Sequence, residues 1–212
     1  SFGLDLHAID KVADANTKMI FICSPNNPTA NVMAFEDILS LCATYADRAL
    51  IVLDETYIQY AEASSLIPLI EETPNLVILR TLSKSHAAAG LRCGAVIARG
   101  EITQLLQKVL APYPLASPVV EAGLAILTSK NHRLLAKKRD ELIERRDRFM
   151  PLLAALPMVY EILPSDANFI LLRVQDAEAF YACCLDAGII VRNQSHQPGL
   201  ANSIRISIGA ED

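Results

Sequence analysis

The sequence predicts an α/β protein with a mostly parallel sheet, helices on both faces of that sheet, and a smaller α+β domain at the carboxyl end. Three short runs of continuously apolar residues, each closed by polar or turn residues, are separated by longer segments. Uninterrupted apolar strands are typical of parallel sheets that are buried on both faces. The last quarter of the chain instead places short strands close together around one helical segment, which predicts a separate α+β unit.

The first half of the chain supplies the strands of the main sheet. We expect them at residues 19–23, 49–53 and 76–79, with a further strand at 93–98. Apolar residues recur at helical spacing over residues 35–47, which predicts a helix there, and helices are expected between the three strands. Because open α/β sheets bind ligands beyond the carboxyl ends of their strands, the residues that follow these strands are the first candidates for a site.

A proline-rich stretch at residues 111–118 separates the two predicted domains. We therefore divide the chain into a large α/β domain, residues 1–112, and a second part, residues 113–212. The second part begins with a helical region that ends near residue 156, whose mixed charges indicate a solvated helix face. The elements expected after it are strands at 159–163, 168–173, 189–192 and 204–208 and a helix at 177–187.

Composition excludes several classes of protein. The chain has 212 residues, 52% of them hydrophobic, and a formal net charge of -5. This content can fill a core, and no basic run is present to follow a nucleic-acid backbone. No apolar stretch reaches the ~20 residues that span a bilayer, so we expect neither membrane nor nucleic acid as a partner. The five cysteines are odd in number and lack metal-ligand spacing, which favours a cytoplasmic setting and no metal site.

Lys84 is the first candidate for a reacting residue. It follows the third strand, and the residues at 87–90 have little bulk, which leaves room for a ligand. A lysine that forms a Schiff base must be kept partly neutral and within reach of a carbonyl group. For an arbitrary lysine, a solvated surface position is the commoner outcome, at roughly three in four.

Residues near the neighbouring strand ends favour the catalytic interpretation of Lys84. Asp54 closes an apolar strand, and a carboxylate there can keep a pyridine nitrogen protonated. The phenol of Tyr57 and the amide of Asn27 can hydrogen-bond a ring hydroxyl. A guanidinium fork and hydroxyl groups can hold a phosphate, and the candidates are Thr81, Ser83 and Arg92. Each residue alone is a weak signal, since Asp54 and Asn27 are also common turn residues.

Three motifs together resemble the fold-type I aminotransferases, which use pyridoxal 5'-phosphate (PLP). They are Ser-Pro-Asn-Asn-Pro-Thr at 24–29, Asp-Glu-Thr-Tyr at 54–57 and Ser-Lys-Ser-His-Ala-Ala-Ala-Gly-Leu-Arg at 83–92. The resemblance covers essentially the whole chain and implies a PLP-transferase-like fold. It implies that Lys84 forms the Schiff base with PLP and that Asp54 pairs with the pyridine nitrogen. Tyr57 and Asn27 would bind the 3'-oxygen, and the phosphate would be held by Thr81, Ser83 and Arg92.

Further motifs resemble the histidinol-phosphate aminotransferases within that superfamily. They are Arg-Thr-Leu-Ser-Lys at 80–84, Ala-Pro-Tyr-Pro-Leu at 111–115, Val-Arg-Asn-Gln at 191–194 and Ser-Ile-Arg-Ile-Ser-Ile-Gly at 203–209. The resemblance implies a homodimer that transfers the amino group of histidinol phosphate to 2-oxoglutarate, giving imidazole acetol-phosphate and glutamate in histidine biosynthesis. Arg192 and Arg205 would clamp the substrate phosphate with planar cationic forks, and Asn27 would also contact substrate. An end-of-strand salt bridge is the structural alternative for Arg192.

Departures and alternatives stand beside this resemblance. Ala30 replaces a glycine that is common after the Asn-Pro-Thr turn, which could alter the loop. The family is longer at its amino end, where it carries a phosphate cradle, so we expect an amino-terminally truncated chain that also lacks its last helix and alone binds PLP weakly. The alternatives are an aromatic amino-acid aminotransferase, a phospho-amino-acid decarboxylase, or a non-catalytic fragment. A nucleotide-binding domain is disfavoured, since no glycine-rich loop follows any strand.

Overall fold

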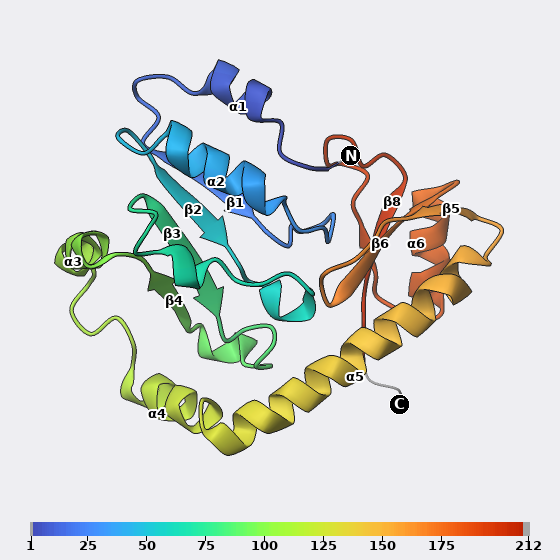
Figure 1. Ribbon diagram of the computed structural model, residues 1–212. Coiled ribbons are helices and arrows are strands. Elements are labelled where there is room, and N and C mark those ends of the chain that lie inside the picture. The colour runs from blue at the N-terminus through green and yellow to red at the C-terminus, as the bar shows by residue number, and fades with distance from the viewer. Residues whose placement is uncertain (1, 210–212) are drawn as a thin grey trace.

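The computed structural model of the chain describes residues 2–209 and contains two four-stranded sheets joined by a long helix (Figure 1). The strand orders are β1-β2-β3-β4 and β5-β6-β8-β7. The first sheet is mostly parallel, because only β4 pairs antiparallel, and every pair in the second sheet is antiparallel. The predicted fold class, a mostly parallel α/β sheet followed by a smaller α+β unit, is confirmed.

The first sheet has the strands that the apolar runs predict. They are β1 (Met19–Cys23), β2 (Leu50–Asp54), β3 (Leu76–Thr81) and β4 (Gly94–Ile97). Helix α1 (Leu6–Val12) precedes β1, and α2 (Phe35–Thr44) joins β1 to β2. The expectation of a helix between β2 and β3 was wrong: two 3-10 turns, η1 (Ile58–Tyr60) and η2 (Ile67–Leu69), make this connection. Each turn is only three residues long, and Pro68 lies in the first turn of η2.

One face of the first sheet carries the main core. Helix α2 buries Ile38 and Leu41 against Ile51 and Leu53 of β2, and each of these side chains is at most 3% exposed. On the other face, the side chains of the edge strand β1 are uncovered, and Phe21 is 65% exposed. The core therefore supports the sheet from the α2 side.

Asn75 fixes the loop before β3 to this core. It is 5% exposed, and its Nδ2 atom donates to the carbonyl oxygens of Cys42 and Ala49, both at 3.0 Å. Replacing Asn75 by Ala removes the donor of two buried carbonyls, so the free energy of unfolding is expected to fall by about 2–4 kcal/mol. Urea unfolding of N75A and of the exposed N16A measures this difference. Equal, small losses in the two variants would contradict the expectation.

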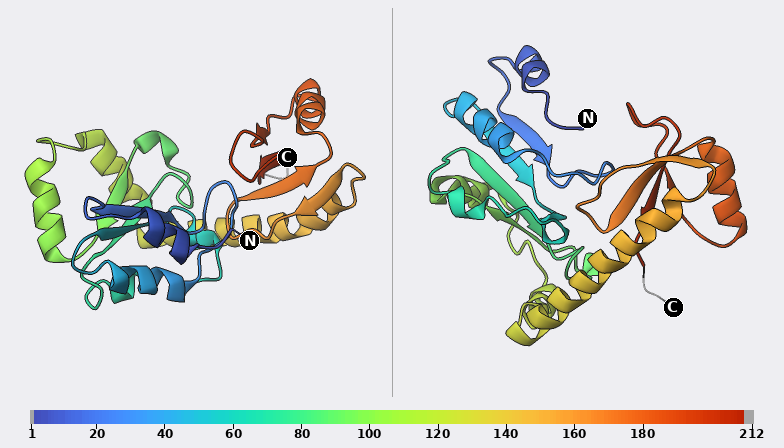
Figure 2. Two further views of the ribbon diagram at one scale, coloured as in Figure 1. Left: turned by 90° about the horizontal axis from the view of Figure 1, so that it is seen from above. Right: turned by 45° about the vertical axis from the view of Figure 1, so that its right-hand side comes forward.

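The second half of the chain has helices α3 (Gly100–Val109), α4 (Ser117–Ile126) and α5 (Ser129–Ala154) before its sheet. Thr128 caps α5 by accepting from the backbone N–H of Asn131. Figure 2 shows α5 passing from α4 to the second sheet. The proline-rich stretch forms the loop between α3 and α4, and the domain boundary at residue 112 stays a prediction. None of the helices in residues 2–209 has the length and apolar character that crossing a membrane requires.

The second sheet confirms most of the expected elements. It contains β5 (Val159–Ile162), β6 (Phe169–Val174), β7 (Arg192–Asn193) and β8 (Ser203–Ser207), with α6 (Ala177–Asp186) beside it. The strand expected at 189–192 was wrong except for Arg192. Ile189 and Ile190 are 56% and 76% exposed and follow the left-handed Gly188, so this apolar run is a surface loop.

Candidate active site at the carboxyl ends of the strands

Asp54 lies at the carboxyl edge of the first sheet, in register with Cys23 of β1 and Leu79 of β3. Its Oδ1 atom accepts the backbone N–H of Thr56 at 2.9 Å, which holds the carboxylate at the point where β2 ends. Burial, and then the negative charge of Asp54, raise the pKa of the Cys23 thiol. The neighbouring cysteine therefore stays neutral and adds no charge to this edge.

A pocket of about 360 Å³ opens beside Asp54, and four residues predicted to hold the cofactor line it: Asp54, Thr81, Ser83 and Arg92. The hydroxyl of Thr81 donates to the hydroxyl of Ser83 at 2.9 Å and accepts the backbone N–H of Ser83 at 3.0 Å. Arg92 is exposed, with Nη1 donating to the carbonyl oxygen of Ala89 at 3.1 Å. Hydroxyls and a guanidinium fit a phosphate, and the carboxylate fits a protonated ring nitrogen.

Lys84 and Tyr57 lie together next to this edge. The Nζ atom of Lys84 is 5.5 Å from the centroid of the Tyr57 ring, and Lys84 is exposed. Tyr57 is 7% exposed, and its ring meets that of Phe169 edge-on, with centroids 5.3 Å apart and planes at 84°. The Tyr57 ring is therefore held from the second sheet, while the amine of Lys84 remains accessible to a ligand.

Arg205 connects the two halves of the candidate site. Its Nη1 atom donates to Oδ1 of Asn27 at 2.7 Å, and its guanidinium lies 5.0 Å from the centroid of the Phe169 ring. Within residues 2–209 the Nε atom of Arg205 is buried without a hydrogen-bond partner. Arg192 is the cross-strand partner of Arg205, so the two side chains start from the same face of the sheet. The structure thus brings both predicted substrate arginines to one place.

The loop that carries Asn27 also contains Ala30, at a position where a glycine is common after an Asn-Pro-Thr turn. Ala30 is fully buried and has φ 63, a backbone region that favours glycine because a Cβ atom is strained there. Its N–H donates to the carbonyl oxygen of Asn26 at 2.8 Å, and its own carbonyl oxygen accepts from the N–H of Asp166 at 2.7 Å. The loop keeps its left-handed turn despite the alanine and is fixed to the second half of the chain.

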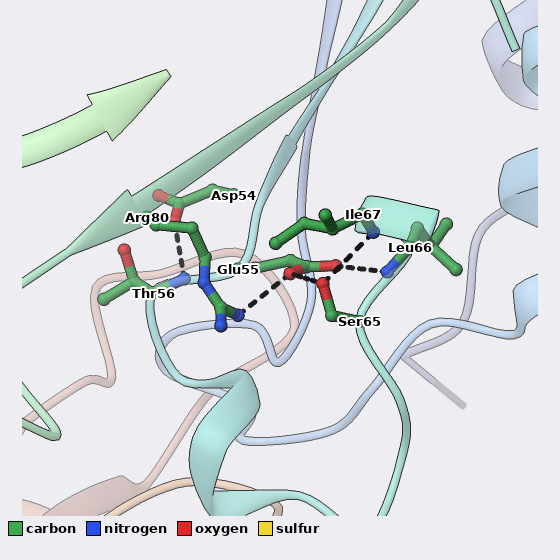
Figure 3. A network of polar contacts seen from close by, with 7 residues as sticks. All are labelled: Asp54, Glu55, Thr56, Ser65, Leu66, Ile67 and Arg80. Carbon is green, nitrogen blue, oxygen red and sulfur yellow. Dashed lines mark hydrogen bonds and ion pairs between the residues drawn. The ribbon is translucent and has the colours of Figure 1, made fainter. Parts of the chain in front are cut away.

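Glu55 and Phe169 are two residues that the sequence did not single out. Glu55 is 1% exposed, and its carboxylate accepts from the hydroxyl of Ser65 at 2.6 Å, the N–H of Leu66 at 2.9 Å and Nη1 of Arg80 at 3.0 Å (Figure 3). The signal available for Glu55 was an acidic residue directly after Asp54. No local pattern marks Phe169, which reaches the site only through the tertiary fold.

His86 and possible metal ligands contribute little further chemistry. Burial, then His132 and Arg80, lower the pKa of His86, so its ring is neutral at pH 7. The Nδ1 atom of His86 is 3.0 Å from the hydroxyl of Ser85. In the part of the chain that the structure describes, no group of three or more His, Cys, Asp or Glu residues is arranged to hold a metal.

The family model "Aminotransferase class I and II" matches residues 1–212. "Histidinol-phosphate aminotransferase" from Sodalis glossinidius is 43% identical over 206 residues, which are 97% of this chain and 57% of that protein. The chain thus spans little more than half the length of this relative.

Solved structures share the fold. Histidinol-phosphate aminotransferase from Sinorhizobium meliloti in complex with pyridoxal-5'-phosphate superposes with a TM-score of 0.84 at 24% identity, covering 97% of this chain and 56% of that one. L-threonine-O-3-phosphate decarboxylase from Porphyromonas gingivalis gives 0.80 at 24% identity, covering 95% and 62%. At these identities the likeness shows the fold alone. Since the family model matches the full sequence, the chain belongs to the class I and II aminotransferase family.

Proposed function

We propose that the protein is a PLP-dependent aminotransferase that uses histidinol phosphate as amino donor and 2-oxoglutarate as acceptor, in histidine biosynthesis. The observation that carries this proposal is the pocket at the sheet edge, which gathers Asp54 with three phosphate-type donors, Thr81, Ser83 and Arg92. Lys84 directly follows Ser83 in the sequence and lies with Tyr57 outside the residues that line this pocket. The 43% identity to a histidinol-phosphate aminotransferase supports the choice of substrate.

The cofactor side of the reaction rests on residues of the first sheet. PLP, when bound, supplies an aldehyde for the amine and a ring that withdraws electrons. In this proposal Lys84 would hold PLP through its aldehyde until the amine of the donor displaces it, and as a free amine it would move the proton of the donor carbon to the cofactor. Asp54 would keep the ring nitrogen protonated, and Tyr57 and Asn27 would donate to the ring oxygen. The phosphate would be held by Thr81, Ser83 and Arg92.

The substrate side rests on the second sheet. Arg205 presents a guanidinium whose Nε atom has no partner among the described residues, and Arg192 stands opposite it. Two cations on facing positions repel each other unless an anion lies between them, so a phosphate is a fitting ligand. Asn27, which accepts from Arg205 at 2.7 Å, lies between the substrate and cofactor groups.

A homodimer in the cytoplasm completes the proposal. Large apolar side chains are exposed on α3, α4 and the loop between them, namely Leu105, Val109, Leu110, Tyr113, Leu115, Val120, Leu124 and Leu127. Exposed apolar side chains in such number can form an interface, and a second copy is the proposed occupant. The cysteines are all free, as in a reducing compartment. Light scattering of the purified protein tests the dimer.

Initial rates with different donors test the function. We expect a kcat/KM for histidinol phosphate at least about 100-fold above that for phenylalanine, because only the former offers a phosphate to the arginines. Formation of glutamate from 2-oxoglutarate is measured in the same assay. Preference for phenylalanine would favour the aromatic aminotransferase, and release of carbon dioxide from a phosphorylated amino acid would favour the decarboxylase.

A further inference from the structure

Glu55 directly follows β2, and its side chain points to the face of the sheet opposite to that of Asp54. Consecutive residues at a strand end point to opposite faces, so the predicted ring partner and the buried carboxylate share one piece of backbone. The N–H of Glu55 continues the ladder by donating to the carbonyl oxygen of Leu79 at 3.0 Å. The backbone of Glu55 is thus fixed to β3 next to Asp54.

Arg80, the ion-pair partner of Glu55, is likewise next in sequence to a candidate site residue, Thr81. Arg80 lies directly before Thr81 in β3, and its guanidinium reaches Glu55 at 3.0 Å while its side chain is 24% exposed. The ion pair therefore joins the segments at the ends of β2 and β3 (Figure 3). Asp54 and Thr81, the sequence neighbours of the pair, line the pocket. Asp54 is expected at the ring nitrogen of PLP and Thr81 at its phosphate.

The energetics of the buried Glu55–Arg80 ion pair indicate that it does more than stabilise the fold. A carboxylate that is 1% exposed is costly to desolvate, and a buried ion pair is often no more stabilising than apolar side chains of the same volume. Ser65 and Leu66 also donate to Glu55, but they hold only the 61–66 loop and do not join the strands. Among the contacts of the Glu55 carboxylate, the one to Arg80 spans the two strands.

We propose that the Glu55–Arg80 ion pair is a positioning element that sets the spacing between Asp54 and the Thr81–Ser83 hydroxyls to fit the ring nitrogen and the phosphate of PLP. This inference rests on the proposed function, since it concerns the same cofactor site. Glu55 is not among the residues that line the pocket and would act through Asp54, whereas Arg80 lines the pocket next to Thr81 and holds Glu55 from there.

The test compares variants that break the pair with variants that keep it. E55Q removes the negative charge with little change of shape, R80M removes the positive charge but keeps an apolar stem, and R80K keeps a cation. S65A removes a hydrogen bond to the same carboxylate without affecting the link between the strands. E161Q, which breaks the partly exposed ion pair with Arg173, is the control outside the site.

Two measurements on the purified full chain separate positioning from folding. PLP titration followed by absorbance gives the dissociation constant and the spectrum of bound PLP, and urea unfolding without PLP gives stability. We expect E55Q and R80M to weaken PLP binding at least about tenfold and to shift the spectrum, with the double variant no worse than either alone. R80K, S65A and E161Q should stay within about threefold of the wild type.

The outcomes distinguish this proposal from the proposed function. Wild-type affinity and spectrum in E55Q and R80M, even with lower stability, would overturn the positioning role and leave the aminotransferase assignment intact. Additive losses in the double variant, or losses in S65A equal to those in E55Q, would also overturn it. Because weak PLP binding is expected, the titration is carried to a large excess of PLP; a wild-type chain that shows no PLP spectrum even there would overturn the proposed function and this inference with it. If E55Q does not fold, the contrast between R80M and R80K decides.

Discussion

Lys84→Ala is expected to abolish transamination, lowering kcat by at least about 1,000-fold, because in the proposed function the same amine would bind the aldehyde and carry the proton. The position of Lys84 agrees with this expectation, because its amine lies 5.5 Å from the Tyr57 ring centroid and is accessible to a ligand. The measurement is turnover with histidinol phosphate, together with borohydride reduction of the PLP complex and mass mapping of the modified peptide.

Lys137→Ala is the matched control for this prediction, because Lys137 is an exposed lysine on α5 that pairs with Glu141. It should keep wild-type turnover and the adduct at Lys84. An adduct that maps to another lysine, or a K84A protein with activity within about tenfold of the wild type, would contradict the role of Lys84. The absence of any adduct from the wild type would instead favour the non-catalytic fragment.

The sequence predicted that the ends of β2 and β3 lie together because local rules govern where parallel strands end. Asp54 and Thr81 end neighbouring parallel strands, and such ends meet at one edge of the sheet. The structure places both in one pocket with Ser83 and Arg92, as the motifs implied. Their contacts with a cofactor remain predictions, since geometry alone does not test the assigned roles.

The contacts that the sequence could not predict are those made across long sequence separations. Arg205 reaches Asn27 from 178 residues away, and Phe169 meets Tyr57 only because α5 and the second sheet bring it there. Glu55 was not predicted to be buried, because acidic residues are mostly exposed unless paired, and its partners lie in other segments. The apolar residues at 189–190 were predicted to form a strand, but they are exposed and belong to a loop.

Arg205→Met is expected to lower kcat/KM for histidinol phosphate about 30- to 1,000-fold, equivalent to about 2–4 kcal/mol, with most of the change in KM. The reason is the loss of a planar cation that the fold has placed ready for an anion. Phe169 supports the guanidinium at 5.0 Å, and Asn27 holds one edge of it. Arg205→Lys keeps the charge but not the fork, so it should recover only part of the loss.

The control for Arg205 is Arg173→Met, which removes an arginine of the same sheet whose guanidinium contacts Glu161 and Gly199 instead. Its kcat/KM should change less than about threefold. Because Arg192 and Arg205 are cross-strand neighbours, inorganic phosphate should also raise the thermal midpoint of the wild type, by relieving their repulsion. R205M should lose that rise and R173M should keep it. An unchanged rise in R205M would show that the anion binds elsewhere, and Arg205 would then serve only to hold Asn27 and Phe169.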